Sequence, residues 1–312
     1  MEHVRACCLP PRCGRTPLIV GVYVDDLVIT GGDPRDISTF KEEMKATFKM
    51  NDLRLLRYYL GLEVTQMGSG ITVCQSAYAA KILEGAGLTG CNPSHTPMES
   101  RLKLSKSSSA PLVDATKYRS IVSSLWYLVN SRPDLAYSVG YISRFMEIPT
   151  TEHMVAVKRV LRYIAGTLHF GCHYQRKKEA QLIGYSDSDL AGDIDTRKST
   201  TGVLFFLACQ GVWLARLLAE FRGVKSRAIT LKIDSESAIQ LSKNPVFHDR
   251  SKHIDVRYHY IRECIEENRV ILESVGTIEE LADILTKALG RERFCELRSK
   301  IGVIDMQTMN KA

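Results

Sequence analysis

The sequence predicts an α/β protein with more than one domain. Near the N-terminus, apolar and β-branched residues flank an acidic pair, Asp25-Asp26, which is typical of two short strands joined by a tight turn. Residues 114–167 carry apolar side chains at helical spacing. From Gln181 onward, strand and helix patterns alternate, as in an α/β domain. The 312 residues leave room for two or three domains that each bury a core.

The acidic pair has an unusual setting, because the run from Leu18 to Ile29 is otherwise mostly apolar. Two like charges held together in a partly apolar place raise the free energy unless a cation neutralises them. Carboxylate oxygens are ligands that Mg²⁺ prefers, and a pair of Mg²⁺ ions commonly catalyses phosphoryl transfer. Aspartate also favours turn geometry by itself. The spacing alone leaves open a metal site and an ordinary hairpin turn.

Local patterns predict the elements around this hairpin. Residues 1–16 show no regular pattern, so we expect an irregular tail there. Asp33 can cap a helix that has Pro34 at its first position, and apolar residues continue at helical spacing as far as Phe48.

The next stretch predicts strands, a helix and an arm. Residues 55–74 have the pattern of strands around a Gly68-Ser69-Gly70 turn, and residues 76–87 have that of a short helix. Residues 91–110 are rich in Pro, Ser and Lys, which indicates a linker or extended arm.

The helical block from Asp114 to about Thr167 is expected to break near Arg132-Pro133. Its second part, residues 151–166, is amphipathic and offers two interpretations, a solvated helix face or a surface that follows a nucleic-acid backbone. The expected apolar side consists of Val155, Val160, Leu161 and Ile164. The expected basic side consists of His153, Lys158, Arg159 and Arg162.

Three acids stand at the ends of elements in the last part of the chain. Asp187 closes a predicted strand over residues 183–187, and Asp234 closes another over 228–234. Asp283 lies on a helix predicted over 279–289. Carboxylates that converge in this way can hold two Mg²⁺ ions, one activating water and one stabilising the leaving oxygen. Acids at strand ends can equally be loop and cap residues.

Composition narrows the class of protein. The apolar content of 45% and charged content of 25% are ordinary for a globular protein, and the net charge of +7 favours a polyanionic partner. Because Asp25 and Asp26 interrupt the longest apolar stretch, no membrane span is expected. Nine cysteines without a CxxC pair indicate reduced thiols in the cytosol or nucleus. Three histidines without zinc-ligand spacing, His248, His253 and His259, are expected to be surface or core residues.

A series of motifs resembles one known family. Gly21-Val22-Tyr23-Val24-Asp25-Asp26-Leu27 resembles the palm-domain hairpin of reverse transcriptases, and the continuation Val28-Ile29-Thr30-Gly31 is similar to copia-type retrotransposon Pol polyproteins. The resemblance covers residues 17–303 in the family's order. The remaining motifs lie at residues 58–64, 118–122, 131–136, 185–189, 251–255 and 282–287.

The resemblance implies a division of the chain and a role for the acids. It implies a reverse transcriptase palm/thumb remnant over 17–90, a linker and helical connection region over 91–170, and a ribonuclease H-like α/β domain over 181–303. It implies that Asp25 and Asp26 are catalytic Mg²⁺ ligands of the polymerase. By the same resemblance, the catalytic Mg²⁺ ligands of the nuclease are Asp187, Asp234 and Asp283.

The sequence departs from the family pattern in both halves. The family has a third polymerase aspartate on an earlier strand, whereas the 22 residues before Tyr23 contain no pattern of a strand ending in Asp. In the nuclease half, a strand and a helix bearing a catalytic Glu are expected between Ala208 and Cys209, so the resemblance implies an internal deletion there. Glu220 lies too far along the remaining helix, predicted over 212–221, to replace that Glu.

The expected function is therefore that of a retrotransposon Pol fragment. It derives from an RNA-directed DNA polymerase and an RNA–DNA hybrid ribonuclease H, and is catalytically impaired. The alternative is an inactive nucleic-acid-binding remnant or a non-functional decayed gene product. Expected partners are RNA–DNA hybrids or duplexes, bound without sequence preference through Lys158, Arg159 and Arg162, and other Pol or Gag products.

Overall fold

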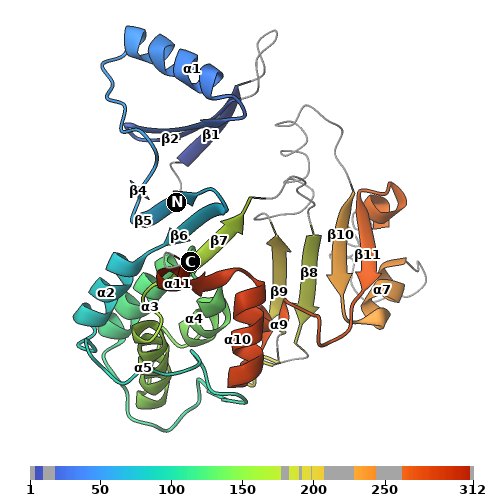
Figure 1. Ribbon diagram of the computed structural model, residues 1–312. Helices are drawn as coiled ribbons and strands as arrows, with labels where there is room; N and C mark the ends of the chain where they lie inside the picture. Colours follow the sequence, from blue (N-terminus) through green and yellow to red (C-terminus); the bar gives the residue numbers. More distant parts are fainter. Residues whose placement is uncertain are drawn as a thin grey trace. The chain divides into compact units, whose positions relative to one another are not determined.

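The computed structural model describes residues 4–9, 18–176, 183–189, 192–197, 199–206, 228–243 and 262–309 (Figure 1). The chain divides into two compact units. The first comprises Met1–Leu56 and Gln210–Ala228, and the second comprises Arg57–Cys209 and Ile229–Ala312. No helix among the described residues is long and apolar enough to cross a bilayer.

The first unit contains an antiparallel sheet and one helix. The sheet has the order β1-β2-β3, with β2 over Leu18–Tyr23 and β3 over Asp26–Gly31. Helix α1, Pro34–Thr47, contacts β3. The Asp33 carboxylate accepts a 2.8 Å hydrogen bond from the Arg35 backbone N–H, and Pro34 occupies the first helical turn. The predicted hairpin and capped helix are thus confirmed.

The expectation of an irregular tail is wrong for part of residues 1–16. Val4–Leu9 forms strand β1, which pairs antiparallel with β2 so that Val4 lies opposite Tyr23. This run contains neither Gly nor Pro, and pairing satisfies backbone groups that an isolated hairpin would leave at the edge of β2. A strand that lacks alternation gives no periodic signal, which is why the sequence did not predict it.

The second unit contains a five-stranded antiparallel sheet, which joins distant parts of the chain. Its order is β12-β7-β6-β5-β4. The strands are β4 (Tyr58–Tyr59), β5 (Leu62–Met67), β6 (Gly70–Cys74), β7 (Phe170–Gln175) and β12 (Val303–Asp305). The strands predicted over 55–74 are therefore present, and the C-terminal β12 completes their sheet beside β7.

A helical block provides most of the buried core of this unit. It consists of α2 (Ser76–Gly85), α3 (Ala115–Val129), the 3₁₀ helix η1 (Pro133–Leu135), α4 (Ala136–Ser143) and α5 (Thr151–Ala165). The expected break occurs over residues 130–132, between the end of α3 and Pro133. Residues 91–110 form no helix or regular strand, yet Met98 and Leu104 are buried in the same core, so this arm packs against the block.

A four-stranded mixed sheet forms the rest of the unit. Its order is β11-β10-β8-β9, in which β8, β10 and β11 run parallel and β9 antiparallel. The strands are β8 (Ile183–Ser188), β9 (Thr201–Phe206), β10 (Ile229–Ile233) and β11 (Val270–Ser274). Helix α7, Glu236–Lys243, follows β10, and α11, Met306–Met309, follows β12.

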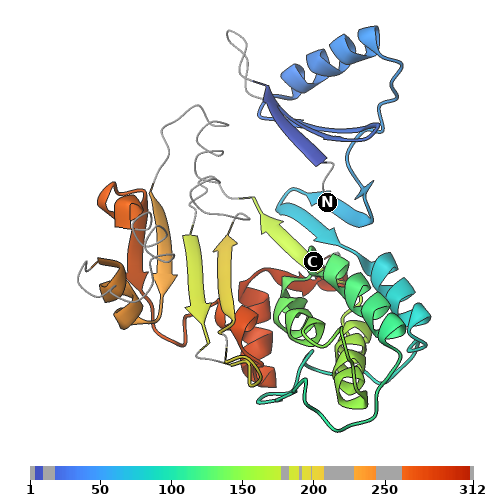
Figure 2. The same ribbon diagram turned by 180° about the vertical axis from the view of Figure 1, so that it is seen from behind.

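Two C-terminal helices lie between the helical block and the four-stranded sheet (Figures 1 and 2). They are α9 (Asp283–Thr286) and α10 (Arg291–Lys300). Helix α9 is much shorter than the helix predicted over 279–289. The Glu280 carboxylate accepts a 2.8 Å hydrogen bond from the Ala282 backbone N–H, and this local bond competes with helix over the preceding residues.

A buried ion pair ties the helical block together at the Arg132-Pro133-Asp134 motif. The Arg132 guanidinium donates to both Asp134 oxygens, at 2.9 and 2.8 Å, and to the Thr167 carbonyl at 2.8 Å. The Tyr163 hydroxyl also donates to Asp134, and Arg298 of α10 donates to the Tyr163 oxygen. This network anchors α10, and with it the segment that carries Asp283.

Candidate functional site

The first acidic pair lies at the tip of the β2–β3 hairpin. Tyr23 pairs with Asp26, so Val24 and Asp25 form a two-residue loop. Val24 has a φ of 52°, a left-handed conformation that is strained for a β-branched residue. Both carboxylates are exposed, so water can solvate them. The predicted partly apolar surroundings are therefore not observed at this pair.

The hairpin offers the donor chemistry of a Mg²⁺ site but only two carboxylates. Mg²⁺ takes six oxygen ligands and often keeps several waters, so two carboxylates suit part of its shell. Over the described residues, no three His, Cys, Asp or Glu side chains gather closely enough to hold a metal ion. Asp25 and Asp26 are adjacent, as predicted, and their role as catalytic ligands stays a prediction.

The second acidic group forms where β8, β10 and α9 meet. Asp187 lies near the end of β8, and Asp234 directly follows the neighbouring parallel strand β10, whose Ile233 pairs with Ser186. Asp283 begins α9. Asp187 is 7% exposed and Asp283 is 5% exposed, whereas Asp234 is half-buried. The topology thus brings the three predicted residues to one region.

Gly202 on β9 allows α9 to approach the sheet. A Cβ built at this position would lie 2.7 Å from the Thr286 methyl group and 2.8 Å from the Leu285 Cβ, both on α9. A larger residue would push the helix away. The close approach places the Thr286 hydroxyl where it donates a 2.5 Å hydrogen bond to the Asp187 Oδ2 atom.

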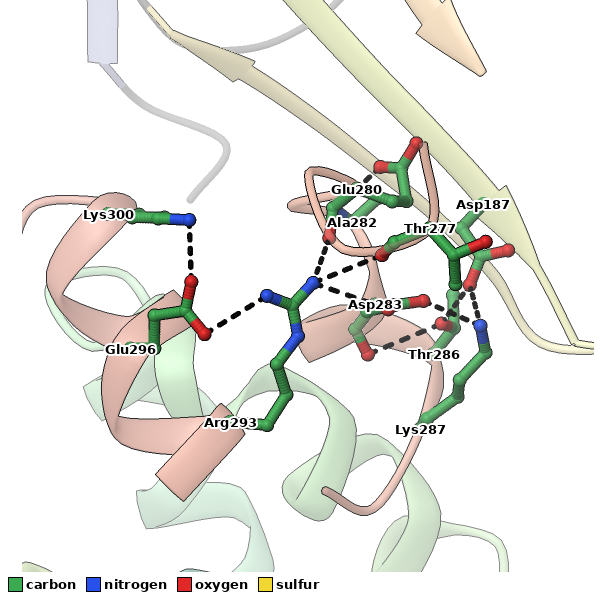
Figure 3. A network of polar contacts seen from close by, with 10 residues as sticks. All are labelled: Asp187, Thr277, Glu280, Ala282, Asp283, Thr286, Lys287, Arg293, Glu296 and Lys300. Carbon is green, nitrogen blue, oxygen red and sulfur yellow. Dashed lines mark hydrogen bonds and ion pairs between the residues drawn. The ribbon is translucent and has the colours of Figure 1, made fainter. Parts of the chain in front are cut away.

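Lys287 lies between the two buried carboxylates (Figure 3). Its Nζ atom is 3.1 Å from the Asp187 Oδ2 atom and 2.5 Å from the Asp283 Oδ1 atom. Arg293 of α10 places Nη2 at 3.8 Å from the other Asp283 oxygen. Burial alone would raise the pKa of Asp187, but the hydrogen bonds from Thr286 and Lys287 outweigh it and lower that pKa. Both carboxylates therefore have a protein cation as partner.

Glu280 is a buried acid at this site that sequence reasoning missed. One carboxylate oxygen accepts the Ala282 N–H bond described above, and the Oε2 atom has no hydrogen-bond partner among the described residues. Burial, with smaller contributions from Asp234, Asp187 and Asp283, raises the pKa of Glu280 to about 7. Its position three residues before Asp283, directly before the apolar pair Leu281-Ala282, was the available signal.

The arrangement of this second group does not fit a divalent ion. The oxygens of Asp187 and Asp283 that face each other are both bound to the Lys287 ammonium. A second cation in the same space would be repelled by that charge. The geometry is that of an internal ion-pair network, and the assignment of these acids as nuclease ligands stays a prediction.

The predicted basic face of α5 is largely engaged within the protein. Arg159 pairs with the Glu99 carboxylate at 2.7 Å, and the Arg162 Nε atom donates to the Asn92 carbonyl at 2.7 Å. Lys158 is exposed. His153 is not on this surface, because it is buried, stacks on Phe145 and accepts a hydrogen bond from the Thr150 N–H.

Burial lowers the pKa of His153, which favours the neutral form of its ring. Val155 was expected on the apolar side of α5 but is exposed, whereas Val160, Leu161 and Ile164 are buried as expected.

Some predicted features lie outside the described residues, namely the Ala208–Cys209 junction, the helix over 212–221 with Glu220, and His248, His253 and His259.

Comparison with known proteins gives the family. Residues 9–100 match the family Reverse transcriptase (RNA-dependent DNA polymerase). The Pol polyprotein of transposon RE1 from Arabidopsis thaliana is 35% identical over 320 residues, which cover 93% of this chain and 22% of the polyprotein. The Pol polyprotein of transposon TNT 1-94 from Nicotiana tabacum is also 35% identical, over 92% of this chain and 24% of its own length.

A shorter relative and a solved structure complete the comparison. A transposon Ty5-1 protein of Saccharomyces cerevisiae is 30% identical over 72% of this chain and 74% of its own length. A foamy viral protease-reverse transcriptase in complex with an RNA/DNA hybrid aligns with a TM-score of 0.47 and 16% identity, over 87% of this chain and 37% of that one. This chain spans about a fifth of the Pol polyproteins that it matches. It belongs to the copia-type retrotransposon Pol family and corresponds to its reverse transcriptase-related region.

Proposed function

We propose that this chain is a Pol fragment that joins the end of a reverse transcriptase palm, through a helical connection, to a ribonuclease H-like module. By itself it carries out neither RNA-directed DNA synthesis nor hybrid cleavage. The observation that carries this proposal is the set of partners that each acidic pair has in the structure. One pair stands without a third carboxylate among the described residues, and the buried pair is bound to Lys287.

Polymerase impairment follows from the chemistry of phosphoryl transfer. That reaction depends almost entirely on positioning and on electrostatic stabilisation by bound metal ions. Asp25 and Asp26 are solvated side chains on a two-residue turn, so within the described residues they provide neither a complete ligand set nor a shielded site. We therefore assign them an ancestral role in binding Mg²⁺ and no activity in the isolated chain.

The nuclease assignment is supported by topology and by the positions of the acids. Strands β8 and β10 bring Asp187 and Asp234 to one end of a mixed sheet, and α9 adds Asp283. A hydrolase with this arrangement needs metal ions to activate water. With Lys287 and Arg293 on these carboxylates, no such step is available to the fragment.

Two assays on the purified chain test the proposal. We expect no primer extension on an RNA template and no cleavage of an RNA–DNA hybrid, with Mg²⁺ or with Mn²⁺. Asp25→Asn and Asp187→Asn serve as site variants, and Asp305→Asn serves as a control away from both pairs. Metal-dependent extension that Asp25→Asn abolishes would refute the polymerase part, and cleavage that Asp187→Asn abolishes would refute the nuclease part.

A nucleic-acid-binding remnant is the second candidate function. The net charge of +7 and the exposed ammonium of Lys158 on α5 favour it. Binding would be weak and independent of sequence, to an RNA–DNA hybrid or a duplex. The setting would be the cytosol or nucleus, in company with other Pol or Gag products. Because Arg159 and Arg162 have partners within the chain, this surface is weaker than the sequence predicts.

A further inference from the structure

We propose that Lys287 is the resident cation of the second acidic site. Its ammonium takes the position between Asp187 and Asp283 that a divalent ion would need, and it closes the site to Mg²⁺. Replacing Lys287 with a neutral side chain should convert the ion-pair network into a divalent-cation site. The inference deepens the proposed function, because it rests on that function for the ancestry of the two aspartates. Its test measures cation binding and stability, so the two proposals can fail separately.

The backbone directs Lys287 into this position. Helix α9 ends at Thr286, and Lys287 has extended backbone angles, φ −133° and ψ 147°. The chain therefore leaves the helix while the side chain turns back by four residues to Asp283 and across to Asp187 on β8. Figure 3 shows the ammonium facing both carboxylates. A lysine that only solvated a helix end would not join two elements in this way.

The charges around Lys287 explain why a cation is needed there. Asp187 and Asp283 are both buried, and the carboxyl groups of Asp234 and Glu280 lie in the same acidic cluster. Buried carboxylates without a counter-charge are strongly disfavoured. Loss of the ammonium must therefore be compensated by protonation of a carboxylate, by local opening of the structure that admits water, or by binding of another cation.

The oxygen atoms left by such a replacement suit a divalent ion. Asp187 and Asp283 would each present an oxygen that no longer binds the ammonium, and the Thr286 hydroxyl donates to that same oxygen of Asp187. Glu280 contributes an independent sign of an incomplete site, since its side chain is fully buried and its Oε2 atom has no partner among the described residues. Carboxylate and hydroxyl oxygens with water are ligands of Mg²⁺ and Mn²⁺.

The experiment compares the full chain with Lys287→Met, which keeps the length of the side chain and removes its charge. Lys300→Met is the matched control, because Lys300 also pairs with a glutamate, Glu296 at 2.6 Å, but lies on the exposed side of α10. Thermal unfolding is followed with chelator and with Mg²⁺ or Mn²⁺. Mn²⁺ binding is titrated by calorimetry on each protein and on the double variant Asp187→Asn/Lys287→Met.

We expect the wild type and Lys300→Met to unfold at the same temperature with and without the cation. Lys287→Met should unfold at a lower temperature, regain stability when Mn²⁺ is added, and bind Mn²⁺ roughly tenfold or more tightly than the wild type. The double variant should lose this binding. If Lys287→Met folds only when Mn²⁺ is present, the proposal is supported in its strongest form.

Three results would overturn the proposal. The first is Mn²⁺ binding by the wild type that is as tight as binding by Lys287→Met, because the ammonium then does not close the site. The second is a Lys287→Met protein whose stability, or whose failure to fold, does not respond to Mn²⁺. Lys287→Arg keeps the positive charge, so it should fold, and its unfolding temperature should not change when Mn²⁺ is added. A cation response in that variant would also contradict the idea.

Discussion

The two acidic pairs of this chain differ in what neutralises them. Asp25 and Asp26 are neighbours in sequence and exposed at a hairpin tip, where the high dielectric of water weakens their mutual repulsion. Asp187 and Asp283 come from distant elements, are buried, and share the ammonium of Lys287. A solvated pair needs no protein partner, whereas a buried pair must have one. The second pair therefore depends on contacts made by the fold, whereas the first pair does not, although the first pair is easier to recognise in the sequence.

A third charged pair extends this comparison and should give the largest effect on stability. Arg132 and Asp134 are both buried within the helical block, so Arg132→Met leaves a buried carboxylate without its partner. We expect the free energy of unfolding to fall by about 3–5 kcal/mol. Urea denaturation followed by circular dichroism measures it. The matched control is Arg35→Met, which breaks an exposed arginine–aspartate pair on α1 and should change little. Equal losses in the two variants would contradict the importance of burial.

Glu280 should make the buried site sensitive to pH. Its pKa is about 7 in the folded protein and near 4.5 when unfolded, so the folded state holds the proton more tightly. Stability contributed by the protonated form is complete below about pH 4.5 and is lost as the pH rises towards 7. Glu280→Gln imitates the protonated carboxyl. It should leave stability unchanged at pH 4 and increase it at pH 8 by on the order of 2–3 kcal/mol.

The measurement is urea denaturation of wild type and Glu280→Gln across this pH range. Glu279→Gln, an exposed neighbour, is the control and should follow the wild type at every pH. Taking differences between variants removes the contributions of the other acids. If the free energy of unfolding of Glu280→Gln changes with pH in the same way as that of the wild type, Glu280 is ionised in the folded state at little cost.

Variants of the two acidic pairs themselves should change the free energy of unfolding by less than the variants described above. Without added cation, Lys287→Met should lose about 1–3 kcal/mol, less than Arg132→Met, because the Lys287 side chain is 40% exposed and its charge is partly screened. Asp25→Asn should leave the free energy of unfolding within experimental error. Denaturation midpoints of the two variants in chelator provide the measurement. A destabilised Asp25→Asn protein would show that the hairpin charge has a structural partner.

How much the sequence revealed depended on how local the deciding contacts are. The hairpin at Asp25-Asp26 and the cap at Asp33 follow from neighbouring residues, and both were predicted. The predicted strands that end at Asp187 and Asp234 are also present, because short apolar runs with turn residues identify them. The family resemblance then pointed to the acids themselves.

The failures share a physical cause, which is dependence on distant partners. Strand β1 exists through pairing with β2, and Glu280 is buried in a segment that leads into α9, which packs closely against β9. The partners of Arg159 and Arg162 lie 60 and 70 residues away in the arm. No periodicity in α5 distinguishes an arginine that will meet this arm from one that will face solvent. The predicted helix over 279–289 is shorter than expected, because the Glu280 carboxylate takes the Ala282 backbone N–H in a local bond that competes with helix.

The smallest expected effect concerns nucleic-acid binding by the basic residues of α5. It compares an exposed basic side chain with one that is bound to other groups of the chain. If α5 contacts a nucleic-acid backbone, Lys158→Ala should lower the slope of log K against log salt concentration by about one unit for an RNA–DNA hybrid. Arg159→Ala should leave this slope nearly unchanged, because its guanidinium is bound to Glu99 and Thr96. Fluorescence anisotropy at several salt concentrations measures both. Equal slopes for wild type and Lys158→Ala would make α5 an ordinary solvated helix. A lower slope for Arg159→Ala alone would mean that the arm over residues 91–110 releases Arg159 to the nucleic acid.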